Sequence, residues 1–155
     1  MNCNNNIFFY FKKISLERSK YFIIFLPFLI YIPLYLQPPK NKLENDVYTS
    51  LPDYFYDIVW FFLYICIGIS WYERRQMGFF INFTYLLLIF LIISWFYIYN
   101  ISKYYALLII ILCFLNSFFL FFYNMHKLNI YASYTMFPLI IWSGYNTYLI
   151  TFVIQ

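Results

Sequence analysis

The side chains of this 155-residue chain that offer chemistry are mostly aromatic rings and amides, with few ionisable groups among them. The single histidine, His126, stands in a short polar stretch, so no Ser-His-Asp or Cys-His catalytic set can be assembled around it. Cys3, Cys66 and Cys113 lack zinc-ligand spacing, and two of them lie inside apolar runs. The sequence therefore predicts neither an enzyme nor a metal site, and no cofactor is required.

Aromatic residues recur at helical spacing in the second apolar run of the chain. Residues at positions i, i+3, i+4, i+7 and i+11 of a helix share one face. Such an aromatic stripe either packs one helix against another or lines a site for a flat apolar ligand, and packing is the commoner role. The stripe consists of Asp57, Trp60, Phe61, Tyr64 and Gly68.

A second face of this kind lies near the end of the chain and carries Pro138, Trp142, Tyr145, Asn146 and Leu149. Pro138 has no backbone N–H, so it frees a carbonyl one turn earlier. Asn146 is the polar residue of this face. In hydrocarbon its amide is expected to hydrogen-bond either another helix, for ~0.5–2 kcal/mol, or a ligand, and the helix contact is the commoner role.

The composition places these faces on membrane helices. The chain is 65% hydrophobic and 10% charged, which is more apolar surface than a soluble domain of this size can cover. Several uncharged runs approach or exceed the ~20 residues that cross a ~30 Å hydrocarbon core. The net charge of +4 lies outside these runs, which favours contact with the lipid bilayer surface rather than with nucleic acid.

The order of these runs predicts an all-α integral membrane bundle of five transmembrane helices in one domain. A polar and basic lead over residues 1–20 precedes the bundle, and one sizeable loop follows the first helix. A short charged turn, Glu73-Arg74-Arg75, is expected to close the second helix. The five spans are expected at residues 21–37, 54–72, 78–100, 104–125 and 129–154.

Lysine and arginine are divided unevenly between the two ends of this bundle. Seven of the ten fall on the side of the N-terminal lead, and the other three are Lys40, Lys42 and Lys103. The positive-inside rule then predicts that the N-terminus faces the cytoplasmic side of a bacterial cell membrane or an organellar membrane. No ionisable residue lies in the middle of a span, which disfavours an ion-coupled transporter.

Residues 52–68 read P-D-Y-F-Y-D-I-V-W-F-F-L-Y-I-C-I-G, and the last span contains M-F-P-L-I-I-W-S-G-Y-N-T-Y-L-I. These two stretches resemble the second and fifth helices of the TspO/MBR family, which includes the translocator protein, the tryptophan-rich sensory protein and the peripheral benzodiazepine receptor relatives. The family pattern P-x-W-x-F-x-x-V-W-x-x-L-Y-x-x-M-G runs through the first stretch without a gap, with Tyr54 in place of its first tryptophan. The third helix matches at Trp95.

The resemblance implies a five-helix bundle that binds hydrophobic ring systems in a pocket between its helices, lidded by the first loop, as a sensor, carrier or scavenger. The implied ligands are tetrapyrroles such as porphyrin or haem, sterols and benzodiazepine-type drugs. A homodimer is also implied. The residues placed at the pocket are Tyr54, Trp60, Trp95, Trp142, Tyr145 and Asn146, with Tyr54 near the loop lid.

Several positions depart from the family pattern. Asn146 stands where the family has a small residue, which narrows the pocket, and Ile92 and Ile150 replace family asparagines. The first loop lacks the W-Y-x-x-L-x-K-P pattern. Two alternatives therefore stay open: a structural or assembly membrane protein whose aromatic faces only pack helices, and a small-solute transporter.

Overall fold

The computed structural model of the chain describes residues 22–30, 32 and 53–154. This part is helical with short connections and contains no strand, so the all-α prediction is confirmed for it. Residues 22–25 form a short α-helical piece that continues into a 3₁₀ helix. The elements are η1 (Leu26–Ile30), α4 (Asp53–Arg74), α5 (Phe79–Ile98), α6 (Lys103–His126), α7 (Ile130–Tyr134) and α8 (Phe137–Ile154).

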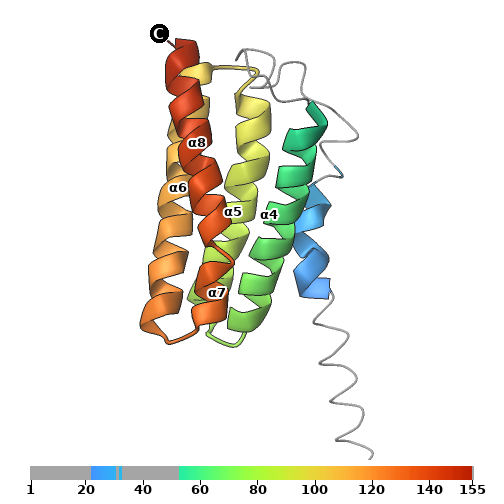
Figure 1. Cartoon of the computed structure of the whole chain (residues 1–155), viewed down its shortest axis with the longest axis vertical. Helices are drawn as coiled ribbons and strands as arrows, with labels where there is room; N and C mark the ends of the chain where they lie inside the picture. The colour runs from blue at the N-terminus through green and yellow to red at the C-terminus, as the bar shows by residue number, and fades with distance from the viewer. Residues whose placement is uncertain (1–21, 31, 33–52, 155) are drawn as a thin grey trace, which may run out of the picture.

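The four long helices run side by side and alternate in direction along the chain (Figure 1). Helix α6 packs against both α5 and α8, while α4 contacts η1, α5, α7 and α8. Helices α4 and α6 both end at the lower end of the bundle in this view, where α7 also lies. The other end carries the start of α4 and the end of α8.

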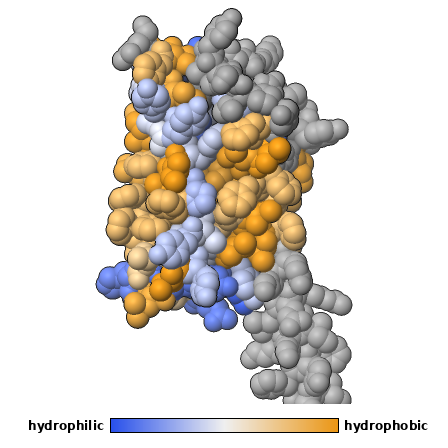
Figure 2. All heavy atoms as spheres, viewed as in Figure 1, coloured by the Kyte–Doolittle hydropathy of each residue, from blue (hydrophilic) through white to orange (hydrophobic). Residues whose placement is uncertain are grey.

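Four stretches of the described part are long and apolar enough to cross a membrane: Phe55–Arg74, Phe79–Ile98, Lys103–His126 and Ile130–Ile154. Hydrophobic residues cover the two flanks of the bundle, and hydrophilic ones gather at the lower end (Figure 2). These features support an integral membrane protein. The first expected span, residues 21–37, lies largely outside the described residues, so the count of five spans stays a prediction.

The charged stretch after the second span differs from its expected form. Glu73 and Arg74 belong to the last turn of α4, and the chain turns only after them, where the Met77 N–H donates to the Arg74 carbonyl over 2.9 Å. Gly78 follows with a φ of 97°, a conformation that glycine adopts without strain. Arg74 is buried at 4% exposure because its guanidinium finds partners on α6.

The last span is two helices rather than one. The Met136 N–H donates to the Ser133 carbonyl over 2.9 Å, which is an i→i−3 bond and ends α7. Pro138 is then the second residue of α8, a position where its missing N–H costs no helical bond. The interruption leaves the Ala132 carbonyl without the Met136 N–H, and side chains of other helices bind it instead.

The N-terminal helical piece approaches α4 at Gly68. A Cβ atom at this position would lie 2.7 Å from the carbonyl carbon and 2.8 Å from the Cα of Ile24, and would clash with its carbonyl oxygen. The same two segments also meet through aromatic rings: the ring centroid of Phe28 lies 4.9 Å from that of Phe61 and 5.9 Å from that of Tyr64. Glycine is therefore the residue that lets these two segments pack backbone to backbone.

Candidate ligand-binding site

Three tryptophans from three helices meet between α4, α5 and α8. Trp60 of α4 lies at the centre, with its ring centroid 5.9 Å from that of Trp95 of α5 and 6.3 Å from that of Trp142 of α8. Tyr145 extends the group at 5.6 Å from Trp142. We call Trp60, Trp95, Trp142 and Tyr145 the tryptophan cluster.

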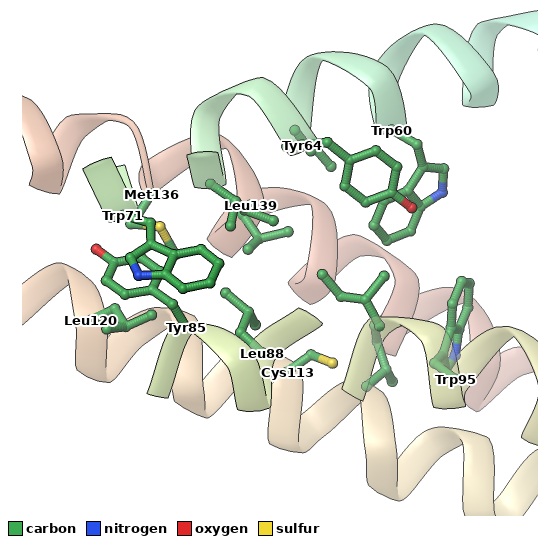
Figure 3. Close-up of a cluster of buried hydrophobic side chains, with 14 of the residues drawn as sticks. Trp60, Tyr64, Trp71, Tyr85, Leu88, Trp95, Cys113, Leu120, Met136 and Leu139 are labelled. Atoms are coloured by element: carbon green, nitrogen blue, oxygen red, sulfur yellow. The ribbon is translucent and has the colours of Figure 1, made fainter. Parts of the chain in front are cut away.

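Helical spacing explains how α4 contributes to this cluster. Tyr56, Trp60 and Tyr64 are four residues apart, and each is at most 5% exposed. The rings of Trp60 and Tyr64 stack at 5.8 Å, and Tyr56 contacts Trp142 at 5.7 Å. Figure 3 shows Trp60 and Tyr64 on α4 and Trp95 on the neighbouring helix at one end of the buried core, away from Trp71 and Tyr85.

Three buried hydrogen-bond donors in this region have no acceptor among the described residues. They are the indole Nε1 atoms of Trp95 and Trp142 and the amide Nδ2 of Asn146. Trp95 and Asn146 are 4% and 2% exposed. Asn146 lies one turn after Trp142 on α8, so its amide belongs to the same face as the cluster. The site thus combines aromatic rings with an excess of donors, which suits a ring compound that carries acceptor atoms.

The remaining predicted residues lie elsewhere or outside the description. Tyr54 is in the first turn of α4, but its side chain lies outside the described residues. The aromatic stripe expected on α4 does not lie on one buried face. Trp60 and Tyr64 are buried, whereas Asp57 and Phe61 are exposed. The two exposed residues line a groove of about 610 Å³ with Phe28 and Ile58, on the side of α4 that faces the N-terminal piece.

The family model described as "TspO/MBR family" matches residues 45–155, which is most of the chain and includes all four described spans. The chain belongs to the TspO/MBR family. The resemblance noted on the second and fifth spans is thereby confirmed. Neither a curated protein nor a solved structure matches the chain.

This TspO/MBR protein also has a buried polar network toward the lower end of its bundle. The Ser70 hydroxyl lies 2.6 Å from the Tyr85 hydroxyl and donates to the Ala132 carbonyl over 2.8 Å. The Nδ2 of Asn124 donates to the Tyr85 oxygen at 3.2 Å and to the Ala132 carbonyl at 3.3 Å. Four helices are joined in this way, with the carbonyl released at the end of α7 as the shared acceptor.

Arg74 completes the network from the last turn of α4. Its Nε donates to Oδ1 of Asn124 over 3.0 Å, and its Nη2 donates to the Asn124 main-chain carbonyl over 2.8 Å. These residues were not predicted from the sequence, because they lie outside the two aromatic faces. A signal was present: Asn124 is a carboxamide late in an apolar run, and an amide in hydrocarbon requires partners.

Proposed function

We propose that this TspO/MBR protein binds a hydrophobic ring ligand at the tryptophan cluster and acts as a sensor, carrier or scavenger. The ligand class is a tetrapyrrole such as porphyrin or haem, with sterols and benzodiazepine-type compounds as further candidates. The proposed role involves no reaction on the ligand. Trp60, Trp95, Trp142 and Tyr145 would provide ring surfaces, and Tyr54 would lie at the loop side.

The observation that carries this proposal is the set of unpartnered donors at Trp95, Trp142 and Asn146. A buried donor without an acceptor costs about 1–3 kcal/mol, so three of them on the helices that form the cluster would be expensive if these residues served only packing. A planar ligand with carbonyl, carboxylate or ring-nitrogen acceptors would satisfy them. Its rings would at the same time gain from stacking on the indoles.

The purified protein in neutral detergent, titrated with protoporphyrin IX while its tryptophan fluorescence is followed, tests the proposal. We expect saturable quenching at micromolar ligand, weakened by Trp60→Phe and by Trp142→Phe. Trp71→Phe is the matched control, because Trp71 is the one tryptophan outside the cluster; it stacks on Tyr85 at 5.9 Å and its indole donates to Asn82. Quenching that never saturates with porphyrin, sterol or benzodiazepine-type ligands would contradict the binding role.

A structural role is the second candidate, and the close ring contacts of the cluster favour it. Rings at 5.3–6.3 Å, as around Trp60, are also what a well-packed helix interface contains. Trp142→Ala separates the two roles. For a structural protein this change should cost roughly 3–5 kcal/mol of stability, whereas for a binding protein the variant should stay folded in detergent and lose ligand affinity.

The transporter alternative receives less support. The charged side chains of the four described spans lie near helix ends, as Asp57, Glu73 and Lys103 do. A coupling charge in the middle of the membrane is what such transporters commonly use.

A further inference from the structure

The lower end of the bundle brings together two polar segments that are far apart in the sequence. Arg74 ends α4, and its guanidinium binds both the side chain and the main-chain carbonyl of Asn124 near the end of α6. The same carbonyl accepts the Asn129 N–H over 3.1 Å, so the turn that holds Lys127 is built on this contact. Lys127 therefore lies within about one helical turn of the residue that Arg74 binds.

Positive charge exceeds negative charge at this end. Among the described residues, Arg74, Arg75 and Lys127 lie here with Glu73 as the acid, while Asp53 and Asp57 lie at the opposite end of α4. Arg74 is 4% exposed, and both of its hydrogen bonds go to neutral oxygens of Asn124. A charge removed from water and not paired with a carboxylate of the described part keeps a strong, weakly screened field.

Arg75 presents a second guanidinium in a fixed position. It lies 3.8 Å from the centre of the Tyr72 ring, and its Nη1 donates to the Tyr72 carbonyl over 2.6 Å. A guanidinium held in place by a ring and a carbonyl loses less side-chain entropy when it binds a further partner. Tyr72 belongs to the last turns of α4, so this arrangement sits at the edge of the apolar span.

We propose that this basic end binds a phosphate group at the membrane surface through the accessible side chains of Arg75 and Lys127, while the buried Arg74 adds its positive charge to the field there. Capping of the α4 and α6 carboxyl ends accounts for where the cations stand, because helix C-termini attract positive charge. Helix capping does not, however, neutralise the charge of these three cations. A phosphate carries negative charge and matches the fork of a guanidinium, and it is available either from an anionic lipid headgroup or from a soluble phosphate ester.

Lipid titration of the full chain in neutral detergent tests this inference. Phosphatidylglycerol is added, and native mass spectrometry measures the fraction of protein with bound lipid. We expect saturable binding that is weaker for phosphatidylcholine. Lys127→Gln should weaken it about fivefold, and Arg75→Gln/Lys127→Gln by roughly 25-fold, since a cation near a membrane surface contributes about a factor of five in affinity.

Lys103→Gln is the matched control, because it removes one lysine from a helix end at the opposite side of the bundle. Its affinity for phosphatidylglycerol should stay within about twofold of the unmodified chain. Equal losses for Lys103→Gln and Lys127→Gln, or an unchanged affinity in the double variant, would overturn the proposed site.

Competition identifies the source of the phosphate. Displacement of the lipid by millimolar inorganic phosphate or glycerol phosphate would assign the site to soluble phosphates, and lack of displacement would assign it to the lipid headgroup. The double variant should leave protoporphyrin quenching unchanged, because Trp60, at the centre of the tryptophan cluster, lies about four helical turns from Arg75 along α4. The two proposals therefore succeed or fail separately.

Discussion

The indole rings of Trp60 and Trp142 meet edge to face, with their centroids 6.3 Å apart and their planes at 90°. This is a favoured geometry for aromatic pairs, because the positive edge of one ring faces the negative face of the other. The contact joins α4 to α8, and the Nε1 of Trp142 remains buried without an acceptor among the described residues. The two rings thus pack α4 against α8, while the Nε1 of Trp142 stays available to a further hydrogen-bond acceptor.

Replacement of Asn146 by leucine separates these two roles at a single side chain. Because the Nδ2 of Asn146 has no acceptor in the described part, Asn146→Leu should leave the thermal unfolding temperature unchanged or raise it. Affinity for a ring ligand with acceptor atoms should fall roughly 3- to 12-fold, as expected for one lost hydrogen bond. Fluorescence titration and thermal unfolding in the same detergent measure both effects.

Ser143→Ala is the control on the same helix. Its hydroxyl donates to the Leu139 carbonyl over 2.7 Å, so it is already satisfied within α8. We expect little change in ligand affinity. A marked loss of stability in Asn146→Leu would instead show that the amide holds helices together.

The close contact at Gly68 predicts different outcomes for two glycine-to-alanine changes. Gly68→Ala should destabilise the packing of the N-terminal piece on α4 by about 1–3 kcal/mol, because the new methyl group would meet the backbone of Ile24. Gly144→Ala places its methyl group 3.5 Å from the Phe114 ring, which is ordinary contact, and should stabilise α8 by roughly 0.5–1 kcal/mol. Thermal unfolding of both variants checks the prediction, and equal effects would contradict it.

The Arg74–Asn124 contact predicts a coupled pair. Asn124→Leu removes the acceptor of the Arg74 Nε and leaves a buried guanidinium short of partners, which should cost about 3–5 kcal/mol. Arg74→Met/Asn124→Leu should recover much of this loss, because the uncompensated charge is gone. A double-mutant cycle from urea or thermal unfolding gives the coupling energy.

Asn116→Leu is the matched control for this cycle, since it makes the same substitution on the same helix. The Asn116 amide donates only a long 3.4 Å bond to the Thr84 carbonyl, and its Oδ1 has no partner in the described part. We expect a change below about 1 kcal/mol. A loss as large as that of Asn124→Leu would mean that the Arg74 charge is not what makes Asn124 sensitive.

The predicted orientation can be tested with single cysteines at the two ends of α6. In a Cys3→Ser background, Lys127→Cys should react with a membrane-impermeant maleimide from the cytoplasmic side, and Lys103→Cys from the opposite side. Cys66 and Cys113 are free but buried, so they should contribute little background labelling. Labelling of both new cysteines from one side would contradict the alternating arrangement of the helices.

The membrane bundle was predictable from the sequence by itself, because the bilayer interior offers no water to hydrogen-bond the backbone. Long uncharged runs must form helices that satisfy their own backbone, and the periodic aromatic residues of α4 and α8 mark the faces that turn inward. The grouping of Trp60, Trp95 and Trp142 was expected from the family resemblance. Their contact distances and unpartnered donors became apparent only when the three helices were placed together.

Only the tertiary structure shows which polar residues are buried and which groups they bind. The sequence predicted a short charged turn at Arg74, yet the residue lies in the last turn of α4 and its side chain is buried, because Asn124, fifty positions later, offers two acceptors. Spacing also predicted one continuous last helix, whereas the chain breaks before Pro138 and gives the Ala132 carbonyl to Ser70 and Asn124. Helical periodicity reports which face of one helix is apolar, but a hydrogen bond between helices depends on their packing, which no single stretch of sequence contains.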